Sequence, residues 1–518
     1  MVQSMKEERY QIWKDQLDAF REKTEAFYAG EIDKKEYKGF SGKYGSYAQR
    51  GGKANMLRLR ITGGMMDKDK LKFVADAAKK HQVSLIHLTT CQTVQFHNLT
   101  PVQVYEVMEQ ALDHGIVTMG GGGDYPRNVT MSPLTGVKGG YMDVSPYALA
   151  AAEYLMGFIQ KEKMPRKLKV SFSDGPENTT HATFRDLGFV ARPDGKFDVY
   201  SAGGLGANPK LGLKVGEAVE PEKILYYIRA MWEVFLTYGN YENRAKARTR
   251  YMQQTLGEEG YVKAFQEKLD QVFASGEHLD FSVKCNEVSK AGDGSFAEGR
   301  RIIPQKQDGL YAVSYHPIGG CVKASKLWEL YEAIKDMDQV QIRLSPDESM
   351  YIINLTGTEA KKVEEATRDG ANSLVEESVA CIGASICQVG VRDSQKLLNL
   401  IVEAVRKAKL PDKALPQLNI SGCPSSCGMH QMGTIGFRGG VKMIDKVPNP
   451  SFTVVVNGCD AQGEERMGKE VGVMLEKDIP AFLVELGKKV AQSGEDFEQW
   501  VKENEEGFMG VVGKYIVT

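Results

Sequence analysis

The alternation of hydrophobic and polar residues between positions 56 and 115 predicts a strand, a helix, two strands and a second helix. MLRLRI alternates as a strand does, and two glycines end it. Segment 69–81 spaces its apolar residues like an amphipathic helix, and VSLIHL and TVQFHNL are predicted strands. Segment 101–115 is predicted to be a helix that ends on Gly115, because glycine is favoured at helix C-termini.

The same order of elements returns between residues 314 and 370. SYHPIGG takes the place of RLRITGG, SKLWELYEAIKDM and TEAKKVEEATRDG are predicted helices, and VQIRL and SMYIINLTG are predicted strands. Gly63 matches Gly319 and Asn98 matches Asn354, each with an offset of 256 residues. Two matches at one offset near half the chain length indicate an internal duplication.

A third match extends the duplication to the regions that follow. LKVSFSDG at 168–175 aligns with LNISGCPS at 418–425, an offset of 250 residues. The first copy of this loop lacks cysteine and carries lysines just before it, in PRKLKV. If one cofactor sits between the two halves, both halves are expected to keep the same fold but to contribute different functional residues. The simpler alternative is a structural repeat without a function.

The two ends of the chain are predicted to serve the main body. Residues 1–50 are expected to form an N-terminal arm, with a helix from about Lys6 to Glu31. KGFSGKYGSYAQRGG then follows as a connection without identifiable chemistry. GTIGFRGG and FTVVVNGCDAQG predict closing strands, and two helices end the chain. GGLGANP at 203–209 does not fit a nucleotide-binding loop, because G-x-G-x-x-G and a surrounding βαβ unit are missing.

Composition narrows the class of protein. The chain has 518 residues, of which 42% are hydrophobic and 26% charged, as in soluble globular proteins of several domains. A net charge of −2 argues against a nucleic-acid partner. No apolar run approaches the roughly 18 residues that cross a bilayer, and the charged N-terminus lacks a signal-peptide core. We therefore expect no membrane partner and a cytoplasmic protein with reduced thiols.

Two close pairs of cysteines lie in CIGASICQVG and SGCPSSCGMH. Five residues separate Cys381 from Cys387, and three separate Cys423 from Cys427. Four thiolates in two loops indicate a soft-metal or iron–sulfur site. Structural zinc prefers pairs with two to four residues between them, so zinc fits the second pair but not the first. Scattered cysteines are expected to be small buried hydrophobes. These are Cys91, Cys285, Cys321 and Cys459.

C-x5-C followed by G-C-P-x-x-C-G resembles the sulfite/nitrite reductase hemoprotein family, from about residue 40 to the C-terminus. The resemblance implies that the four paired cysteines hold a [4Fe–4S] cluster, which Cys427 also bridges to the iron of siroheme. It implies an internally duplicated α+β fold, in which two ferredoxin-like half-domains pair as one domain beside two related α/β domains. The expected half-domains are 51–115 and 306–370. The α/β domains are expected at 116–305, for siroheme and substrate, and at 371–518, for the cluster and siroheme.

Sulfite, nitrite and the carboxylates of siroheme all require cations around them. Arg58 and Arg60 share one face of a strand, Arg127 follows four glycines, and Lys167 and Lys169 share another strand face. Any one of them alone is most often a solvated surface charge. Together they match the family's motifs, so the resemblance implies that Arg58, Arg127, Lys167 and Lys169 are catalytic and that Arg60 binds cofactor.

One strand departs from the family pattern T-T/N-R-Q-x-x-Q. Here it is LTTCQTVQ, so Cys91 replaces an arginine that serves siroheme, and His87 replaces a second arginine. Cys91 is either a tolerated replacement or an extra thiol near the ring. By resemblance, the cofactor-binding residues of this strand are Thr90, Cys91, Gln92 and Gln95. The segment ENRAKARTRY offers compensating cations, and its Arg248 or Arg250 matches a cofactor-binding position of the family.

The K-x-K pair favours one substrate. It resembles sulfite reductases, whereas many plant-type nitrite reductases carry an uncharged residue at the second position. The sequence therefore predicts six-electron reduction of sulfite to sulfide, with nitrite reduction to ammonia as the alternative. Because no nicotinamide site, flavin site or further cysteine cluster is visible, the donor is expected to be ferredoxin or a separate flavoprotein. A zinc-stabilised binding scaffold without redox chemistry is the hypothesis from a different class.

Overall fold

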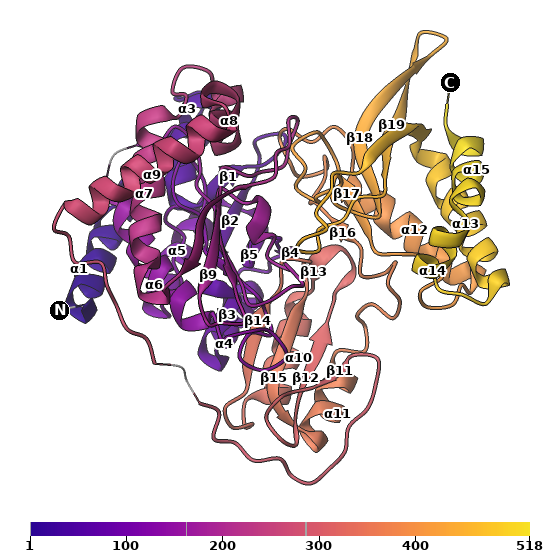
Figure 1. Ribbon diagram of the computed structural model, residues 1–518, viewed down its shortest axis with the longest axis horizontal. Helices are drawn as coiled ribbons and strands as arrows, with labels where there is room; N and C mark the ends of the chain where they lie inside the picture. Colours follow the sequence, from indigo (N-terminus) through magenta and orange to yellow (C-terminus); the bar gives the residue numbers. More distant parts are fainter. Residues whose placement is uncertain (1, 162, 285–286, 518) are drawn as a thin grey trace. The chain divides into compact units, whose positions relative to one another are not determined.

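The computed structural model describes residues 2–161, 163–284 and 287–517, which form two compact units. The first unit runs to Gly204 and also comprises Pro209–Ser314 and Val322–Arg368. The second comprises Leu205–Asn208, Tyr315–Cys321 and the chain from Asp369 onward (Figure 1). Cys285 lies outside the described residues.

The first ferredoxin-like half-domain is a five-stranded sheet in the order β1-β2-β5-β4-β13. Helices α4 and α5 alternate with its strands as the hydrophobic pattern predicts. Its elements from the first repeat are β1 (Ser46–Ala48), β2 (Asn55–Arg60), α4 (Lys68–Lys80), β4 (Leu85–Leu88), β5 (Thr93–Leu99) and α5 (Pro101–Asp113).

The second half-domain repeats this sheet in the order β11-β12-β15-β14-β3. Its elements from the second repeat are β11 (Ile302–Pro304), β12 (Leu310–Tyr315), α10 (Ala324–Ile334), β14 (Gln341–Leu344), β15 (Met350–Thr356) and α11 (Gly357–Ala366).

Each half-domain takes its fifth strand from the other repeat. Strand β3 (Met65–Met66) pairs with β14, with Ile342 opposite Met66, and β13 (Cys321–Val322) completes the first sheet. The two exchanged strands are separated by the same 256 residues that the sequence repeat predicts. The exchange pairs the half-domains into one domain, and the predicted duplicated α+β fold is confirmed.

The repeated Asn-Leu-Thr triplets have one physical basis in both copies. Asn98 and Asn354 adopt positive φ angles of 61° and 63°, which Asn tolerates better than most residues. In each copy a glutamine side chain makes two hydrogen bonds with the asparagine: its amide nitrogen donates to the Asn side chain, and its amide oxygen accepts from the Asn backbone N–H. The glutamine is Gln49 in the first copy and Gln305 in the second. The threonine two residues later forms a capping box on the next helix.

The first α/β sheet has the order β10-β9-β8-β7-β6, and β6, β7 and β8 run parallel. The helices α6, α7 and α9 pack over it around an apolar core that includes Phe172, Phe189 and Trp232 (Figure 1). The elements are β6 (Thr130–Met131), α6 (Ser145–Met156), β7 (Val170–Ser173), β8 (Leu187–Ala191), β9 (Phe197–Ser201), β10 (Leu213–Val219), α7 (Ile224–Tyr238), α8 (Met252–Leu256) and α9 (Glu258–Ala274).

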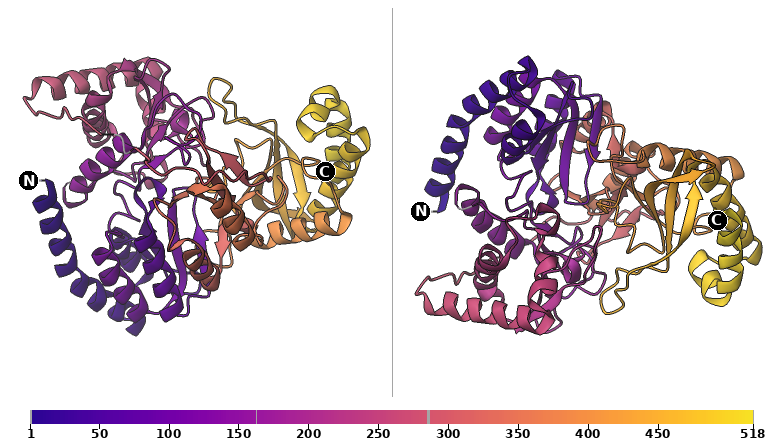
Figure 2. Two further views of the ribbon diagram at one scale, coloured as in Figure 1. Left: turned by 90° about the horizontal axis from the view of Figure 1, so that it is seen from below. Right: turned by 90° about the horizontal axis from the view of Figure 1, so that it is seen from above.

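The second unit contains the related sheet β16-β17-β18-β19-β20, again with its first three strands parallel. The closing helices pack together beside this sheet (Figure 2). The elements are β16 (Val379–Ala380), α12 (Ser394–Ala408), β17 (Leu418–Ser421), β18 (Ile435–Ile444), β19 (Val447–Val456), β20 (Lys469–Leu475), α13 (Ile479–Ser493), α14 (Phe497–Glu503) and α15 (Glu505–Tyr515).

The register of this second repeat differs from the sequence alignment. Val170 pairs with Leu187 in the first sheet, and Leu418 pairs with Ile435 in the second, so the offset between the strands is 248 residues rather than 250. Side chains alternate between the faces of a strand, so a shift of two residues leaves the hydrophobic pattern unchanged. The pattern alone therefore could not fix the register.

The N-terminal segment is more than a connecting arm. The predicted single helix is divided into α1 (Val2–Asp15) and α2 (Leu17–Ala29), and a third helix, α3 (Lys34–Ser41), follows. Strand β1 then pairs with β2, with Ser46 opposite Leu57. The segment therefore supplies an edge strand of the first half-domain. The domain boundaries expected from the sequence stay a prediction.

Candidate active site

Cations gather where the parallel strands of the first α/β sheet begin. Arg127 lies before β6, Lys167 and Lys169 lie before β7, and Arg185 lies before β8. Because the strands run parallel, their amino-terminal ends meet at one edge of the sheet. The charges of Arg58, Lys169 and Arg185 all act on the Cys91 thiol, and that thiol in turn affects Arg127. We call the four basic residues at these strand starts, Arg127, Lys167, Lys169 and Arg185, the cation cluster.

Cys91 lies in the turn between β4 and β5 and is half-buried, not fully buried as expected. Its backbone carbonyl accepts a hydrogen bond of 3.0 Å from Asn128 Nδ2, which holds the turn in place. Burial acts to raise the pKa of the thiol, but the charges of Lys169, Arg185 and Arg58 outweigh burial and lower it to about 6. The thiol that replaces a family arginine therefore lies among cations.

The glycines before Arg127 give its guanidinium backbone acceptors. Arg127 Nη2 donates to the Gly123 carbonyl at 2.8 Å, and Nη1 donates to Gly121, whose carbonyl also accepts from Arg58 Nη1. A Cβ atom at Gly121 would lie 2.7 Å from the Thr118 carbonyl, so a larger residue does not fit there. This close approach explains why the chain needs glycine at the site.

Tyr47 was not predicted, because the segment that carries it showed no chemical motif. Its hydroxyl accepts a hydrogen bond of 2.5 Å from the Gly123 backbone N–H. Burial raises the pKa of Tyr47, but the charges of Arg127 and Arg58 and the Gly123 hydrogen bond lower it further than burial raises it. Tyr47 is thus a second acidic group within reach of the cation cluster.

Arg60 has a different set of partners from Arg58. Its Nη1 donates to Met119 O and Pro126 O at 2.9 and 3.1 Å, and its Nη2 donates to Arg127 O at 3.0 Å. The side chain is 2% exposed. Arg60 therefore ties down the backbone on both sides of the glycine run, although the sequence suggested that it contacts cofactor.

A buried carboxylate that the sequence did not indicate, Asp186, holds two basic segments of the site together. Asp186 is completely buried and accepts from the Lys169 backbone N–H at 2.8 Å. It also accepts from Arg248 Nη2 at 3.0 and 3.1 Å and from the Thr249 hydroxyl. Asp186 thus fixes the strand start that carries Lys169 together with the predicted cofactor residue Arg248. Asp124, which directly follows the glycine run, accepts hydrogen bonds from Arg166 and Arg244.

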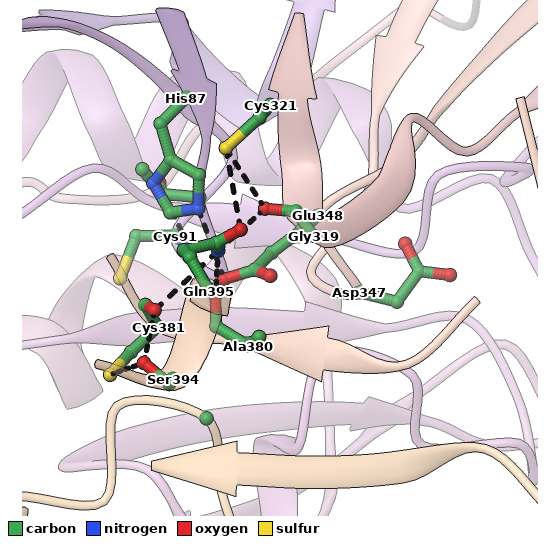
Figure 3. Close-up of polar contacts among 12 residues, drawn as sticks. His87, Cys91, Gly319, Cys321, Asp347, Glu348, Ala380, Cys381, Ser394 and Gln395 are labelled. Carbon is green, nitrogen blue, oxygen red and sulfur yellow. Dashed lines mark hydrogen bonds and ion pairs between the residues drawn. The ribbon is translucent and has the colours of Figure 1, made fainter. Parts of the chain in front are cut away.

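The other predicted residues of β4 and of the turn that follows it make separate contacts. Gln92 donates to Met131 O at 2.8 Å and to Leu344 O at 2.6 Å, so it joins the first α/β sheet to β14. Thr90 is half-buried in the turn. His87 Nε2 lies 3.5 Å from a carboxylate oxygen of Glu348, and both side chains are buried (Figure 3). His87 therefore lies beside the Glu348 carboxylate, which belongs to the same compact unit.

The cysteine loops lie at the carboxyl-terminal edge of the second α/β sheet, whereas the cations lie at the amino-terminal edge of the first. Cys381 follows β16 and Cys423 follows β17, and these strands run parallel, so both loops leave from the carboxyl-terminal edge. Cys423 is buried, Cys381 and Cys387 are half-buried, and Cys427 is exposed. Ligands of parallel sheets commonly bind at this edge.

Cys381 receives polar contacts at its sulfur. The Gly422 backbone N–H donates to Cys381 Sγ at 3.2 Å, and the Ser394 hydroxyl lies 3.1 Å from the same atom (Figure 3). Gln395 Nε2 donates to Ala380 O at 2.6 Å and to Gly319 O at 2.9 Å, which anchors the loop (Figure 3). A backbone N–H that donates to sulfur, like that of Gly422, is typical of sites for metal-bound thiolates.

The cysteine residues fit an iron–sulfur cluster. Burial, with the nearby Cys427, raises the pKa of Cys381 to about 12, so this thiol stays protonated until a metal replaces the proton. The cysteine loops leave two neighbouring parallel strands at one edge, so their thiols are placed to supply the cysteine ligands that a [4Fe–4S] cluster would need.

The basic residues fit a polycarboxylate such as siroheme. Within the described part of the chain, the Nε atoms of Arg127 and Arg248 are buried and have no hydrogen-bond partner. Buried donors of this kind are costly unless an acceptor arrives. An anionic group that accepts from them would remove that cost.

Comparisons with known proteins agree with this geometry. A family model described as the nitrite/sulfite reductase ferredoxin-like half domain matches residues 47–114. A second, described as the nitrite and sulphite reductase 4Fe-4S domain, matches residues 122–273. In the residues that the structure covers, no helix combines the length and apolar character needed to span a membrane.

Similar curated proteins include both kinds of reductase. The chain is 25% identical to a sulfite reductase [ferredoxin] of Mycobacterium tuberculosis, over 94% of this chain and 92% of the relative. It is 24% identical to a ferredoxin–nitrite reductase of Synechococcus elongatus, over 74% of this chain and 76% of the relative. The solved structure of the M. tuberculosis NirA protein has the same fold, with a TM-score of 0.75 and 23% identity over 94% of both chains.

Proposed function

Because the chain belongs to the sulfite/nitrite reductase hemoprotein family, we propose that it reduces sulfite to sulfide in a six-electron reaction. The observation that carries the proposal is the cation cluster at the amino-terminal edge of three parallel strands. Its charges suit a small oxyanion, and the buried, unpartnered Nε of Arg127 suits an additional acceptor.

The chain's own residues would bind the oxyanion and deliver protons. Arg58, Arg127, Lys167 and Lys169 are proposed to hold its oxygens, since guanidinium and ammonium groups are strong donors to anions. Each oxygen that leaves as water needs two protons. Ammonium groups of the lysines beside those oxygens, with Tyr47 as a nearby acidic group, would supply them.

The same family assignment indicates the cofactors. A [4Fe–4S] cluster would be held by Cys381, Cys387, Cys423 and Cys427, and Cys427 is proposed to be its link to siroheme. The carboxylates of siroheme would pair with Arg248, with Thr90 as a further proposed contact. The resemblance implies contacts from Arg60, Gln92 and Gln95 as well, but their side-chain polar groups bind groups of the protein itself. When bound, these groups supply the electrons and the iron to which the substrate binds.

Lys169 is the reason to propose sulfite as the preferred substrate. A second lysine adds positive charge that favours the dianion sulfite over the monoanion nitrite. Nitrite remains the second candidate because of Cys91, whose pKa is lowered to about 6. A thiolate beside Lys169 cancels part of that charge at neutral pH, which favours the monoanion.

The electron donor is proposed to be ferredoxin or a separate flavoprotein. Relatives of this chain are named as ferredoxin-dependent reductases of sulfite and of nitrite. The scaffold hypothesis loses its basis, because the similar proteins are enzymes and the family model that matches residues 122–273 is described as a 4Fe-4S domain.

The test is anaerobic oxidation of reduced methyl viologen by the purified protein, with sulfite and nitrite in parallel. We expect faster turnover per site on sulfite at low concentration, with sulfide as the product. Lys169→Asn should shift the preference toward nitrite, whereas the exposed Lys163→Asn should not. Preference of the wild type for nitrite would support the second candidate, and turnover of neither anion by a protein holding both cofactors would overturn the proposal.

A further inference from the structure

Arg58 is held by a side-chain pair on the neighbouring strand. Arg58 of β2 and Gln95 of β5 are cross-strand partners. With the Gln95 amide oxygen turned toward the guanidinium, it accepts from Arg58 Nε at 3.1 Å and from Nη2 at 2.6 Å. The amide nitrogen then donates to His97 Nε2 at 3.2 Å. The reverse orientation would place donors against donors, so this hydrogen-bond network selects one orientation.

The network is buried and His97 is suited to be its acceptor. Gln95 is 7% exposed and His97 is 1% exposed. Burial, together with the neighbouring His87 and Arg58, lowers the pKa of His97 to about 3. His97 is therefore neutral at ordinary pH, and its Nε2 lone pair stays available to the Gln95 amide.

Two N–H groups of Arg58 remain available to bind an anion. A guanidinium has five N–H donors. Gln95 takes those of Nε and one of Nη2, and the Gly121 carbonyl takes one of Nη1. One N–H is left on each Nη atom by these contacts of the described residues, which is enough to donate to two oxygens of one anion.

We propose that Gln95 and His97 are positioning residues that lock the plane of the Arg58 guanidinium for bidentate binding of the substrate oxyanion. The inference rests on the proposed function and adds residues to it. Without the His97 acceptor, the Gln95 amide can turn over and present its NH₂ group to Arg58. The guanidinium would then lose its anchor, and binding of the anion would have to order it again.

The test compares His97→Phe with His97→Gln in the holoenzyme. Phe keeps the ring volume but removes the acceptor, whereas Gln restores an acceptor. The matched control is His81→Phe, because His81 is another buried histidine of the first half-domain outside the cation cluster. Gln95→Met is the second variant, since it removes the acceptor of Arg58 without changing His97.

Three quantities are measured for sulfite. Steady-state turnover gives KM and kcat, and the anion-dependent shift in Tm of enzyme that is not turning over gives the dissociation constant. We expect His97→Phe and Gln95→Met to raise both KM and the dissociation constant about tenfold, which corresponds to about 1.4 kcal/mol. The kcat should change less than about twofold, His97→Gln should recover most of the affinity, and His81→Phe should resemble wild type.

Unchanged affinity in His97→Phe and Gln95→Met, with an active wild type, would overturn the inference. So would a loss of kcat alone, shared by His81→Phe, because that result indicates general structural damage. If the wild type turns over neither sulfite nor nitrite, the proposed function fails. The sulfite dissociation constants then still decide whether Gln95 and His97 position an anion-binding arginine.

Discussion

Cys91 shows how neighbours change the chemistry of one residue. A half-buried cysteine ordinarily keeps its proton at neutral pH. Here Lys169, Arg185 and Arg58 surround the thiol and favour its charged form. If the resemblance is right that an arginine is usual here, a cysteine changes the sign of the local charge rather than only removing a cation.

The first prediction is that Cys91 reacts with iodoacetamide with a midpoint near pH 6, followed by mass spectrometry of the Cys91 peptide. Lys169→Met should move the midpoint upward, whereas Lys163→Met should leave it in place. Because the folded-state pKa is lowered, ionisation of Cys91 stabilises the fold fully above the unfolded pKa of roughly 8.5. That contribution is lost as the pH falls through about 6. A midpoint in the ordinary range would contradict this account.

Asp186 carries the second prediction. It is completely buried and binds Arg248, Thr249 and the Lys169 backbone. Asp186→Asn leaves the Arg248 charge without its counter-charge, which costs about 3–5 kcal/mol of unfolding free energy for a buried pair. Urea unfolding measures the loss. Glu365→Gln is the control, because Glu365 and Arg368 form an exposed pair. Equal losses of unfolding free energy in the two variants would show that the loss does not depend on burial of the ion pair.

At the scale of elements, the two α/β sheets use opposite edges for their chemistry. The cation cluster lies where β6, β7 and β8 begin, and the cysteine loops lie where β16 and β17 end. The sequence alignment placed the lysines just before the counterpart of the cluster loop, and the structure separates them by the length of β7. The repeat thus conserves the sheet while each copy uses a different end of it.

The third prediction concerns the turn after β17. A Cβ atom at Gly422 would lie 2.4 Å from the Arg392 carbonyl, and the Gly422 N–H contacts Cys381 Sγ. Gly422→Ala must therefore move the cysteine loop, and iron and acid-labile sulfide per chain should fall several-fold. Gly440→Ala is the control, because nothing lies within 4 Å of its Cβ position. Full iron content in Gly422→Ala would place the cluster elsewhere.

At the scale of the whole molecule, the repeats are joined by exchanged strands. Strand β3 of the first repeat belongs to the second sheet, and β13 belongs to the first. Gln92 adds a further link, because its amide binds Met131 O and Leu344 O. The half-domains are therefore expected to unfold together.

The fourth prediction tests that coupling by hydrogen exchange. Ile342 is completely buried in β14 and lies opposite Met66 of β3. Ile342→Ala should cost about 2–5 kcal/mol and speed exchange at β3 in the other repeat. Ile435→Ala, in the sheet of the second unit, is the matched control and should leave β3 unaffected. Unchanged protection of β3 in Ile342→Ala would mean that the half-domains unfold independently.

The sequence alone determined the local features of this protein. The period of its hydrophobic residues predicted the helices and the three inner strands of both half-domains, but not their edge strands, and two matches at 256 residues revealed the repeat. The cysteine spacing and its flanking glycines indicated the family that the comparisons support. These features depend on short segments, in which neighbouring residues alone set the pattern.

Tertiary structure decided what depends on distant segments. Tyr47, Arg185 and Asp186 join the site only because a strand edge and an N-terminal segment bring them there. The strand exchange and the 248-residue register also require the pairing of strands, since side-chain alternation is the same after a shift of two residues. The charge state of Cys91 belongs here as well, because it is set by cations far apart in the chain.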